Sequence, residues 1–313
     1  MELPDHRNGP TPLTMASTED CDPRFADIDG WPTLGAVEAM LEGQIAALEA
    51  IRSATQPLAQ AAAAAAARLS SGGGRLVYAG AGTSGRVAVQ DGVELGPTFG
   101  WPATRLAYLI AGGMAALAES VEGAEDDQAA ARAAVAAHAI GPGDVVIGVA
   151  ASGRTPFTLA VLEAARTSGA LTIAIANNPQ TPLLSAAEHG LLAATGSEII
   201  AGSTRMKAGT AQKAMLNMLS TAIMLRLGRV YRGLMVDMQI SNDKLLARAQ
   251  AMVARLGDCS PEAAAEALER TNRSIKAAVL VAKGARPDQA LALLQTHHGL
   301  LRPALESLKG GAA

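Results

Sequence analysis

Two glycine-containing turns with hydroxyl side chains are the places in this sequence best suited to hold an anion. The first reads GAGTSGR at 80–86 and the second reads AASGRTP at 150–156, each directly after a short apolar run. Glycine lets backbone N–H groups turn toward a ligand, a helix that begins at the turn adds positive potential, and hydroxyl groups donate further hydrogen bonds. Either turn alone is also typical of an ordinary tight turn, but the two together predict a site for the phosphate group of a sugar phosphate.

The first turn also has the G-x-G-x-x-G spacing of a dinucleotide-binding motif. Such a site needs an acidic residue about 20 residues further on, at the end of the next strand, to bind a ribose hydroxyl. The next apolar run ends in LIAGG at 109–113, without an acid, and the Lys-Ser/Thr ending of a nucleotide-binding P-loop is missing as well. Dinucleotide binding is therefore the weaker alternative.

Two glutamates are candidates for acid–base chemistry. Glu94 lies between apolar residues and a proline, in GVELGP at 92–97, and we expect it outside a helix, just after the helix that follows the first turn. Glu125 lies in EGAEDD at 122–127, before another predicted helix. Acids near a helix N-terminus are favoured by the helix dipole alone, so that simpler interpretation stays open for Glu125.

A third polar cluster, GSEIIAGSTRMKAGTAQK at 196–213, precedes a long predicted helix. We expect Glu198, Ser203 and Lys207 to meet a ligand at the start of that helix. The alternative is an ordinary helix start with Ser203 or Thr204 as its N-cap. The five histidines and two cysteines have no metal-binding spacing, so we expect neither a metal nor another cofactor.

The elements that position these groups follow from the hydrophobic pattern. Short apolar runs predict strands over 75–79, 106–110, 144–149, 171–176 and 191–194. Helical patterns alternate with them over 86–92, 114–121, 126–138 and 156–168, and the long helix follows over 204–227. This alternation predicts an α/β fold in which a parallel sheet is sandwiched by helices. Because the carboxyl ends of parallel strands meet at one edge, we expect both turns to face one crevice.

The chain is expected to have three parts. Residues 1–32 are expected to form an irregular N-terminal arm, and 33–235 an α/β phosphosugar domain that begins with two helices separated near Pro57. Residues 236–313 are expected to form a small all-helical C-terminal module. Within it, Ser260 and Pro261 have the types preferred at the N-cap and the first position of a helix.

Composition excludes several classes of function. The 313 residues are 49% hydrophobic but only 3% aromatic, and the net charge is −3. A nucleic-acid binder needs a basic face and, for single strands, aromatic stacking platforms, so we expect no nucleic-acid partner. We find no apolar leader and no apolar run of about 18–20 residues, so we expect a soluble cytoplasmic protein without a membrane partner. The shortage of aromatic rings also favours a phosphorylated sugar over a neutral one as the ligand.

In this order along the chain, these segments resemble the N-acetylmuramic acid 6-phosphate etherase family of the sugar isomerase (SIS) superfamily. The resemblance rests on GAGTSGR at 80–86, Glu94 with PTFG at 97–100, IAGG at 110–113, VEGAED at 121–126, AASGRTP at 150–156, GSTRMKAGTAQK at 202–213, NMLST at 217–221 and LMVD at 234–237. It implies a SIS-type, flavodoxin-like sheet and a homodimer whose site, at the carboxyl edge of the sheet, is shared between subunits. It also implies cleavage of the D-lactyl ether of a phosphosugar, giving N-acetylglucosamine 6-phosphate and D-lactate during recycling of cell-wall sugars.

The resemblance also assigns roles to individual residues. Glu94 matches the family's catalytic acid, and Glu125 its second catalytic carboxylate. Thr83, Ser84, Ser152 and Thr155 match the phosphate-binding positions, and we add Gly82, Arg154, Glu198, Ser203 and Lys207 as candidates for substrate binding. Three segments depart from the family: QDGVE stands at 90–94 where LDASE is common, GSE stands at 196–198 where GPE is common, and the helix at 39–46 reads AMLEGQ at 39–44 without the usual Asn-x-Glu-Asp pattern. The glutamates are retained in all three.

Two other functions stay open. An aldose–ketose phosphosugar isomerase needs the same phosphate site and a base, but no acid directed at C3 of the sugar. A non-catalytic sugar-phosphate sensor, similar to the glucokinase regulatory protein, needs only the phosphate-binding turns. The pair of Glu94 and Glu125 favours the etherase, and release of D-lactate separates the three functions.

Overall fold

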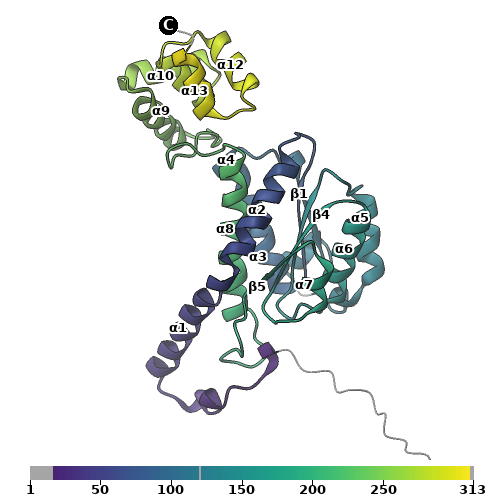
Figure 1. The fold of residues 1–313 in the computed structure, drawn as a ribbon. Helices are drawn as coiled ribbons and strands as arrows, with labels where there is room; N and C mark the ends of the chain where they lie inside the picture. The colour runs from purple at the N-terminus through teal and green to yellow at the C-terminus, as the bar shows by residue number, and fades with distance from the viewer. Residues whose placement is uncertain (1–16, 120, 311–313) are drawn as a thin grey trace, which may run out of the picture.

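The structure is a computed structural model that describes residues 17–119 and 121–310 (Figure 1). Its strands are β1 (Leu76–Gly80), β2 (Leu106–Ile110), β3 (Val145–Val149), β4 (Leu171–Ala176) and β5 (His189–Leu192). Its helices are α1 (Thr33–Glu49), α2 (Thr55–Leu69), α3 (Gly82–Val93), α4 (Leu95–Phe99), α5 (Gln128–Ala137), α6 (Pro156–Thr167), α7 (Pro182–Ala186), α8 (Lys207–Arg226), α9 (Asp243–Gly257), α10 (Pro261–Arg270), α11 (Ile275–Ala282), α12 (Pro287–Thr296) and α13 (Leu301–Gly310). Of the arm predicted over 1–32, residues 1–16 lie outside the described part, and the rest contains short 3-10 turns before α1.

The five strands form one parallel sheet in the order β2-β1-β3-β4-β5, which confirms the predicted α/β sandwich. β1 and β3 are buried along their whole length because helices cover both faces of the sheet. In the sheet, β2 lies on one side of β1 and β3 on the other, so the connections that follow β1 and β2 run in opposite directions along the sheet. A crevice therefore opens beyond the carboxyl ends of β1 and β3, where both glycine turns begin.

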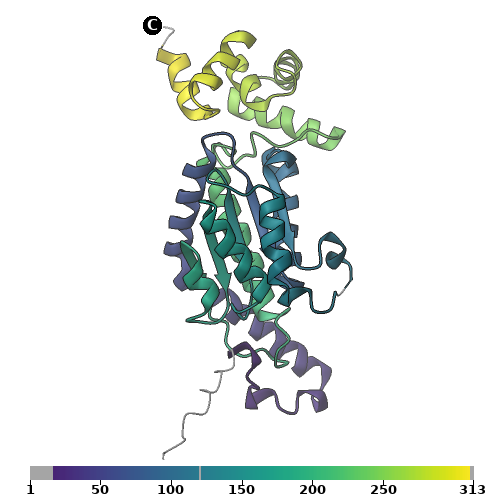
Figure 2. The same ribbon diagram turned by 90° about the vertical axis from the view of Figure 1, so that its right-hand side faces the viewer.

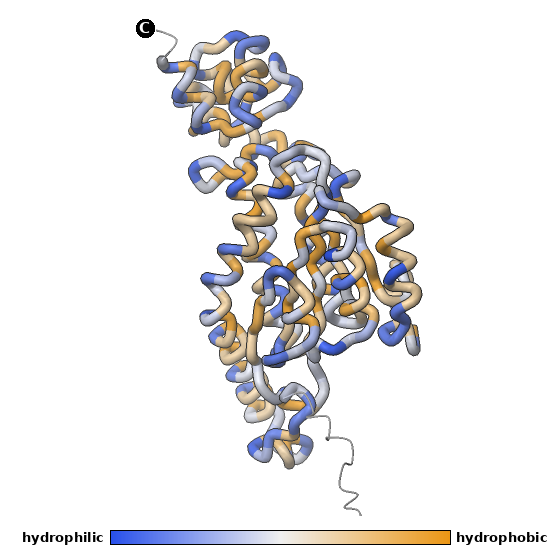
Figure 3. The backbone as a smooth tube through the Cα atoms, turned by 45° about the vertical axis from the view of Figure 1, so that its right-hand side comes forward, coloured by the Kyte–Doolittle hydropathy of each residue, from blue (hydrophilic) through white to orange (hydrophobic). Residues whose placement is uncertain are grey.

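Each face of the sheet has its own layer of helices and its own core. Helices α2, α3 and α8 cover one face, and α5, α6 and α7 cover the other (Figure 1); Figure 2 looks at the molecule from the side of α5, α6 and α7. In Figure 3 the strands at the centre of this sandwich are the most hydrophobic part of the domain. The alanine run of α2 places Ala61, Ala62, Ala65 and Ala66 in the core, so α2 packs closely between the sheet and α8.

Three predicted helices differ from the observed ones. α3 begins at Gly82 and not at 86, so the hydroxyl residues of the first turn belong to the helix. The helix predicted over 114–121 is a 3-10 turn, Met114–Leu117, preceded by two glycines with positive φ. Pro57 lies in the first turn of α2, where its missing N–H costs nothing, and the predicted break between two helices precedes it at 50–54.

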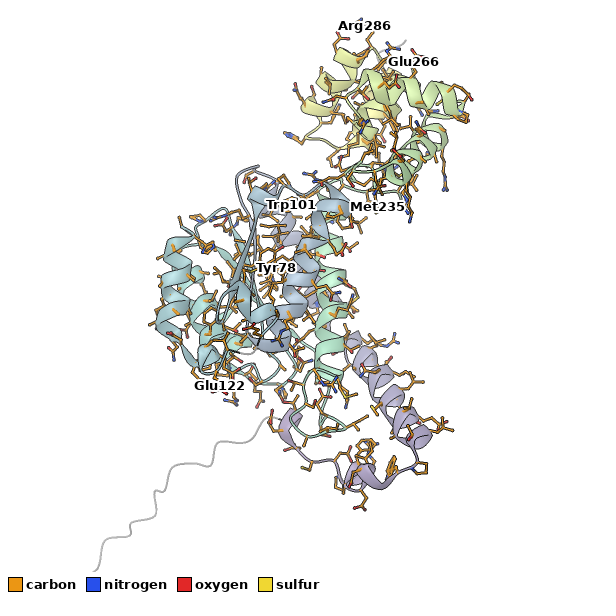
Figure 4. All side chains as sticks on the ribbon, turned by 180° about the vertical axis from the view of Figure 1, so that it is seen from behind. Tyr78, Trp101, Glu122, Met235, Glu266 and Arg286 are labelled. Atoms are coloured by element: carbon orange, nitrogen blue, oxygen red, sulfur yellow. The ribbon has the colours of Figure 1, made fainter. Side chains whose placement is uncertain are left out.

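Helices α9 to α13 form the C-terminal module, which packs around a separate hydrophobic cluster. Ser260 Oγ accepts the N–H of Ala263 at 3.2 Å and Pro261 is the first residue of α10, so the predicted helix start is confirmed. The module lies at the opposite end of the molecule from the crevice: in Figure 4, Trp101 is labelled beside the module and Glu122 at the far end. Among residues 17–119 and 121–310, none of the helices combines the length and the hydrophobicity that crossing a bilayer requires.

Asp144 joins the starts of β1 and β3. Its carboxylate accepts hydrogen bonds from Arg75 N at 2.9 Å, from Arg75 Nη2 at 2.7 Å and from Gly141 N at 3.0 Å. Burial alone would raise the pKa of Asp144, but these hydrogen bonds outweigh it and the pKa is lowered. The carboxylate form is therefore the one that the fold stabilises.

Replacing Asp144 with Asn is expected to lower the free energy of unfolding by about 3 kcal/mol at neutral pH, because Arg75 loses its charged partner. Since the pKa of Asp144 is lower in the folded than in the unfolded chain, this stabilisation should persist down to about pH 4 and vanish as the pH falls through the lowered value. Urea unfolding followed by circular dichroism measures the difference. Asp288→Asn is the control, because Asp288 and its partner Arg286 are 70% and 75% exposed, and it should cost less than about 1 kcal/mol. Equal losses in both variants would contradict this account.

Candidate active site

The first turn forms the start of α3, directly beyond β1. Gly82 has a φ of 51°, and a Cβ on Gly80 would come within 2.9 Å of Gly85 N, so both positions favour glycine. The N-cap is Ala81, whose side chain has no hydrogen-bonding group. The N–H groups of the first helical turn, together with the hydroxyl of Ser84 and its neighbouring threonine, are therefore available to an anion.

The second turn is built in the same way between β3 and α6. Gly153 has a φ of 64°, and a Cβ there would come within 2.3 Å of Thr181 Oγ1. Arg154 N donates to Ser152 Oγ at 3.2 Å, and α6 begins directly after Thr155. This turn therefore places two hydroxyls and a guanidinium group at a helix start.

Both turns line one cavity of about 430 Å³ at the carboxyl edge of the sheet, as predicted. Of the candidate residues, its walls include Gly82, Thr83, Ser84, Glu125, Ser152, Arg154 and Thr155. The cavity thus combines hydroxyls, helix-start N–H groups and a cation, which suit a phosphate, with a carboxylate that can move a proton. Glu19, Asp126 and Thr204 also line it, although we had not predicted them as site residues.

A second cavity of about 350 Å³ adjoins the first and shares Ala81, Gly82 and Glu125 with it. Arg86 fixes the loop that forms its outer wall: Nε donates to Leu117 O at 3.1 Å and Nη2 donates to Ala116 O at 3.0 Å. Glu125 therefore lies where the two cavities meet. A phosphate on one side of it leaves room for the rest of a sugar on the other.

Glu94 does not line either cavity. It follows α3, whose 12 residues span about 18 Å from the first turn. Its predicted position just after that helix is confirmed, but α4 begins at once with Leu95, so its backbone keeps helical angles of φ −78° and ψ −13°. The side chain is exposed near the C-terminal module, where Pro97 O accepts the N–H of Gln239. Within one chain, the structure does not bring Glu94 and Glu125 together.

The third predicted cluster is organised around the start of α8. Glu198 is fully buried, and its carboxylate accepts the N–H groups of Lys207 and Ala208, each at 2.9 Å. Because α8 begins at Lys207, the alternative of an N-cap at Ser203 or Thr204 is wrong, and Glu198 bonds the first N–H groups of the helix from a separate loop. Lys207 Nζ donates to a backbone carbonyl of the same loop at 2.8 Å. Of this cluster, the described cavity wall includes Thr204 but not Glu198, Ser203 or Lys207.

The side chain of one asparagine holds the N-terminal arm beside the cavity. Asn178, just after β4, accepts hydrogen bonds from Ser17 Oγ at 2.8 Å and from Thr18 N at 3.3 Å, and its amide donates to Ala151 O at 2.9 Å in the second turn. These contacts hold Glu19 at the cavity wall. Since 160 residues separate Thr18 from Asn178, no local pattern in the sequence indicates this contact.

Part of the chain matches a known family model, and the fold matches a solved structure. Residues 57–166 match the family model described as the glucokinase regulatory protein N-terminal SIS domain. A crystal structure named as a phosphosugar isomerase involved in capsule formation, from Bacteroides fragilis, matches with a TM-score of 0.50 and 18% identity over 64% of this chain and 95% of that one, which shows a shared fold.

The sequence similarity to individual proteins is much higher. The chain is 47% identical to N-acetylmuramic acid 6-phosphate etherase of Deinococcus radiodurans, over 85% of this chain and 87% of that protein. It is 43% identical to the protein of the same name from Streptomyces coelicolor, over 98% of this chain and 99% of that protein. With this identity over almost the whole chain, and with the SIS-type fold and cavity described above, the protein belongs to the N-acetylmuramic acid 6-phosphate etherase family.

Proposed function

We propose that the protein cleaves the D-lactyl ether of N-acetylmuramic acid 6-phosphate, giving N-acetylglucosamine 6-phosphate and D-lactate in the recycling of cell-wall sugars. The observation that carries this proposal is the cavity in which two hydroxyl-bearing helix starts meet Glu125. The helix starts and hydroxyls suit a 6-phosphate, and the carboxylate beside them suits removal of a proton from the sugar. The name shared by the relatives supplies the identity of the sugar and of its leaving group.

Elimination followed by addition of water explains why two carboxyl groups are needed. In the open-chain sugar, the C1 aldehyde acidifies the proton on C2, and the carboxylate of Glu125 takes that proton. The electron pair forms a C2–C3 double bond while the C3–O bond breaks, and the carboxylic acid of Glu94 protonates the departing lactate oxygen. Water then adds to C3, giving its proton to Glu94, and Glu125 returns a proton to C2. Both carboxyl groups thereby recover their starting forms.

Binding of the phosphate positions the reacting carbons. We assign phosphate binding to the helix starts and hydroxyls of Gly82, Thr83, Ser84, Ser152 and Thr155, with Arg154 as the cation of the cavity. When the phosphate end of the open-chain sugar is fixed, C2 and C3 are held near the carboxyl groups. The binding energy of the phosphate thereby lowers the activation free energy of the reaction. Glu198, Ser203 and Lys207 then act indirectly, by holding the loop that brings Thr204 to the cavity. A phosphorylated sugar is retained inside a cell by its charge, so a cytoplasmic location is part of this proposal.

Because Glu94 lies at the far end of α3, we propose that it acts in the site of a second copy of the chain. Five exposed apolar side chains recur at three- and four-residue spacing along α1; we call Leu34, Val37, Leu41, Ile45 and Leu48 the α1 stripe. Figure 1 shows α1 extending beyond the sheet and its covering helices. Met218 and Leu225 of α8 and Val93, next to Glu94, are exposed as well. A row of exposed apolar side chains of this length is typical of a protein–protein interface, and a two-fold homodimer would cover it on both subunits.

The function is tested with purified protein and N-acetylmuramic acid 6-phosphate. D-lactate should be released, and in labelled water the product should carry solvent deuterium at C2 and solvent oxygen at C3. An isomerase would form a ketose without lactate, and a sensor would bind the sugar without turnover, so either result would reject the proposed function. Release of lactate without either label would leave the function standing but reject the elimination.

Arg86→Gln is expected to lower kcat by about 10- to 100-fold with a smaller change in KM, because the loop beside Glu125 loses its anchor while the phosphate-binding turns remain. Steady-state kinetics of lactate release measure both constants. Arg132→Gln is the control, since Arg132 is exposed on α5 and bonds Gln128 one turn away. A loss confined to KM, or an equal loss of kcat in the control, would show that Arg86 does not position the loop.

A further inference from the structure

We propose that the protein has a second anion-binding site, separate from the catalytic cavity of the same chain and suited to a small phosphate monoester. The site is a cavity of about 440 Å³ between the sheet domain and the C-terminal module, in the region where Figure 4 labels Trp101. The ends of α2 and α8, the turn before β2 and the loop before α13 supply its walls. Within the described chain, it has no lining residue in common with the two cavities at the carboxyl edge.

Arginine dominates the lining of this site. Arg105, Arg226 and Arg229 line it together with His298, and its described lining residues include no Asp or Glu. The guanidinium carbons of Arg105 and Arg229 lie 4.2 Å and 5.7 Å from the centre of the same Trp101 ring. Burial, and after it the charge of Arg229, lower the pKa of Arg105. These cations repel one another, and a bound dianion would offset that repulsion.

Arg105 has a structural role that accounts for its own charge. Its Nε donates to Gly74 O at 2.6 Å, and its Nη2 donates to Leu69 O at 2.9 Å. The second bond caps the last turn of α2, whose carbonyl end carries about half a negative charge. The charge of Arg105 therefore balances the negative end of the α2 dipole. The positive charges of Arg226 and Arg229 are not balanced in this way.

Arg226 and Arg229 have no comparable partners. Arg226 is exposed, and the ion pairs among residues 17–119 and 121–310 do not include it. The contacts of Arg229 are long: 3.4 Å to Gly100 O and 3.5 Å to Asp237 Oδ2. Good charge-assisted hydrogen bonds are about 2.7–2.9 Å, so Arg229 keeps much of its capacity to donate. Two under-used guanidinium groups at one cavity are the feature that points to a ligand.

The shape and chemistry of the cavity define the ligand class. Guanidinium groups bind phosphate through paired N–H donors, and the volume is within the range of small-molecule pockets. Leu69, Leu227 and Leu300 give the cavity an apolar side as well. A phosphate monoester with a compact organic group fits this combination, because the phosphate can meet the arginines while the organic group contacts the leucines.

Arg229 also connects the site to the way the C-terminal module is held. Asp237, which Arg229 approaches from the sheet domain, accepts a hydrogen bond from Lys276 of α11 at 2.5 Å. Burial raises the pKa of Asp237 and lowers that of Lys276, so this pair sits in a poorly hydrated contact. A ligand that draws Arg229 toward its phosphate would change the charge balance at Asp237. Binding at the site would thereby be coupled to the attachment of the module.

The test uses isothermal titration calorimetry on the full-length chain with glycerol 3-phosphate as the probe. The background variant Ser84→Ala/Ser152→Ala weakens the catalytic phosphate site, so that one binding event per chain should remain. Adding Arg226→Ala should weaken this event by about tenfold or more, as expected for a lost charged hydrogen bond. Arg229→Lys, which keeps the charge beside Asp237 but loses the paired donors, should weaken it as well.

A matched control separates specific binding from general attraction. Arg255 is an exposed arginine on α9, away from the lining residues, and Arg255→Ala should leave the binding constant unchanged. Absence of any binding to the background variant would overturn the proposal. So would binding that Arg226→Ala leaves intact, or that Arg255→Ala weakens equally.

Discussion

A mixture of two inactive variants, Glu94→Gln and Glu125→Gln, is expected to recover up to about one quarter of wild-type lactate release once their subunits exchange. Random exchange in a two-fold dimer makes half of the dimers mixed. If each site takes Glu94 from one subunit and Glu125 from the other, a mixed dimer has one intact site and one site that lacks both glutamates. Each variant alone should lose about 10²- to 10⁴-fold in kcat, the usual contribution of general acid–base catalysis.

The expected recovery follows from the length of α3. A site contained in one chain would need Glu94 and Glu125 side by side, whereas α3 has 12 residues, begins with the turn that faces Glu125 and ends just before Glu94. Mixing Glu94→Gln with the double variant is the control, because no subunit in that mixture supplies Glu94 and no activity should return. Differently tagged subunits show whether exchange has occurred. If exchange is complete and the first mixture stays inactive, the shared site is wrong.

Leu41→Lys/Ile45→Lys is expected to convert the protein to a monomer and to abolish lactate release. Both side chains are 60% exposed in the single chain. Burying a large aliphatic side chain contributes about 1.5–3 kcal/mol to the free energy of association. Because the dimer is two-fold symmetric, each substitution removes this contribution twice, and burying the lysines adds a further cost. Light scattering after size-exclusion chromatography measures the mass, and the lactate assay measures the loss of the shared site.

The control for this variant is Leu291→Lys. Leu291 is 49% exposed, but it lies on α12 of the C-terminal module, outside the α1 stripe. It should change neither mass nor activity, and circular dichroism should show that both variants remain folded. A Leu41→Lys/Ile45→Lys protein that stays dimeric would mean that the α1 stripe is not the interface. A monomer with full activity would instead contradict the need for a second subunit.

Features set by neighbouring residues could be predicted from the sequence. The apolar runs fix the strands because a buried parallel strand needs a continuous hydrophobic stretch. The start of α10 follows from Ser260 and Pro261, whose effects on a helix end act within one turn. The shared cavity follows from two similar turns, because strand ends in a parallel sheet meet at one edge.

Features that depend on distant contacts could not be predicted in this way. We expected the helix after the first turn to begin at 86; its start at Gly82 makes it four residues longer and carries Glu94 to the other end of the domain. We expected Glu198 at a ligand, but the structure uses it to cap α8 across a loop. Glu19 reaches the cavity because Asn178 and the backbone N–H of Gly202 hold Thr18, and no periodicity in the sequence indicates those contacts.

The burial of Trp101 makes the region between the two domains observable without a chemical label. The chain has two tryptophans: Trp31 is 37% exposed in the N-terminal arm, and Trp101 is 1% exposed, with its indole N–H donating to Arg105 O at 2.9 Å. Indole emission shifts to longer wavelength when water reaches the ring. In a Trp31→Phe protein, the remaining tryptophan fluorescence would come from Trp101 alone. Its emission maximum, followed during turnover, would report whether the C-terminal module keeps its contact with the sheet domain.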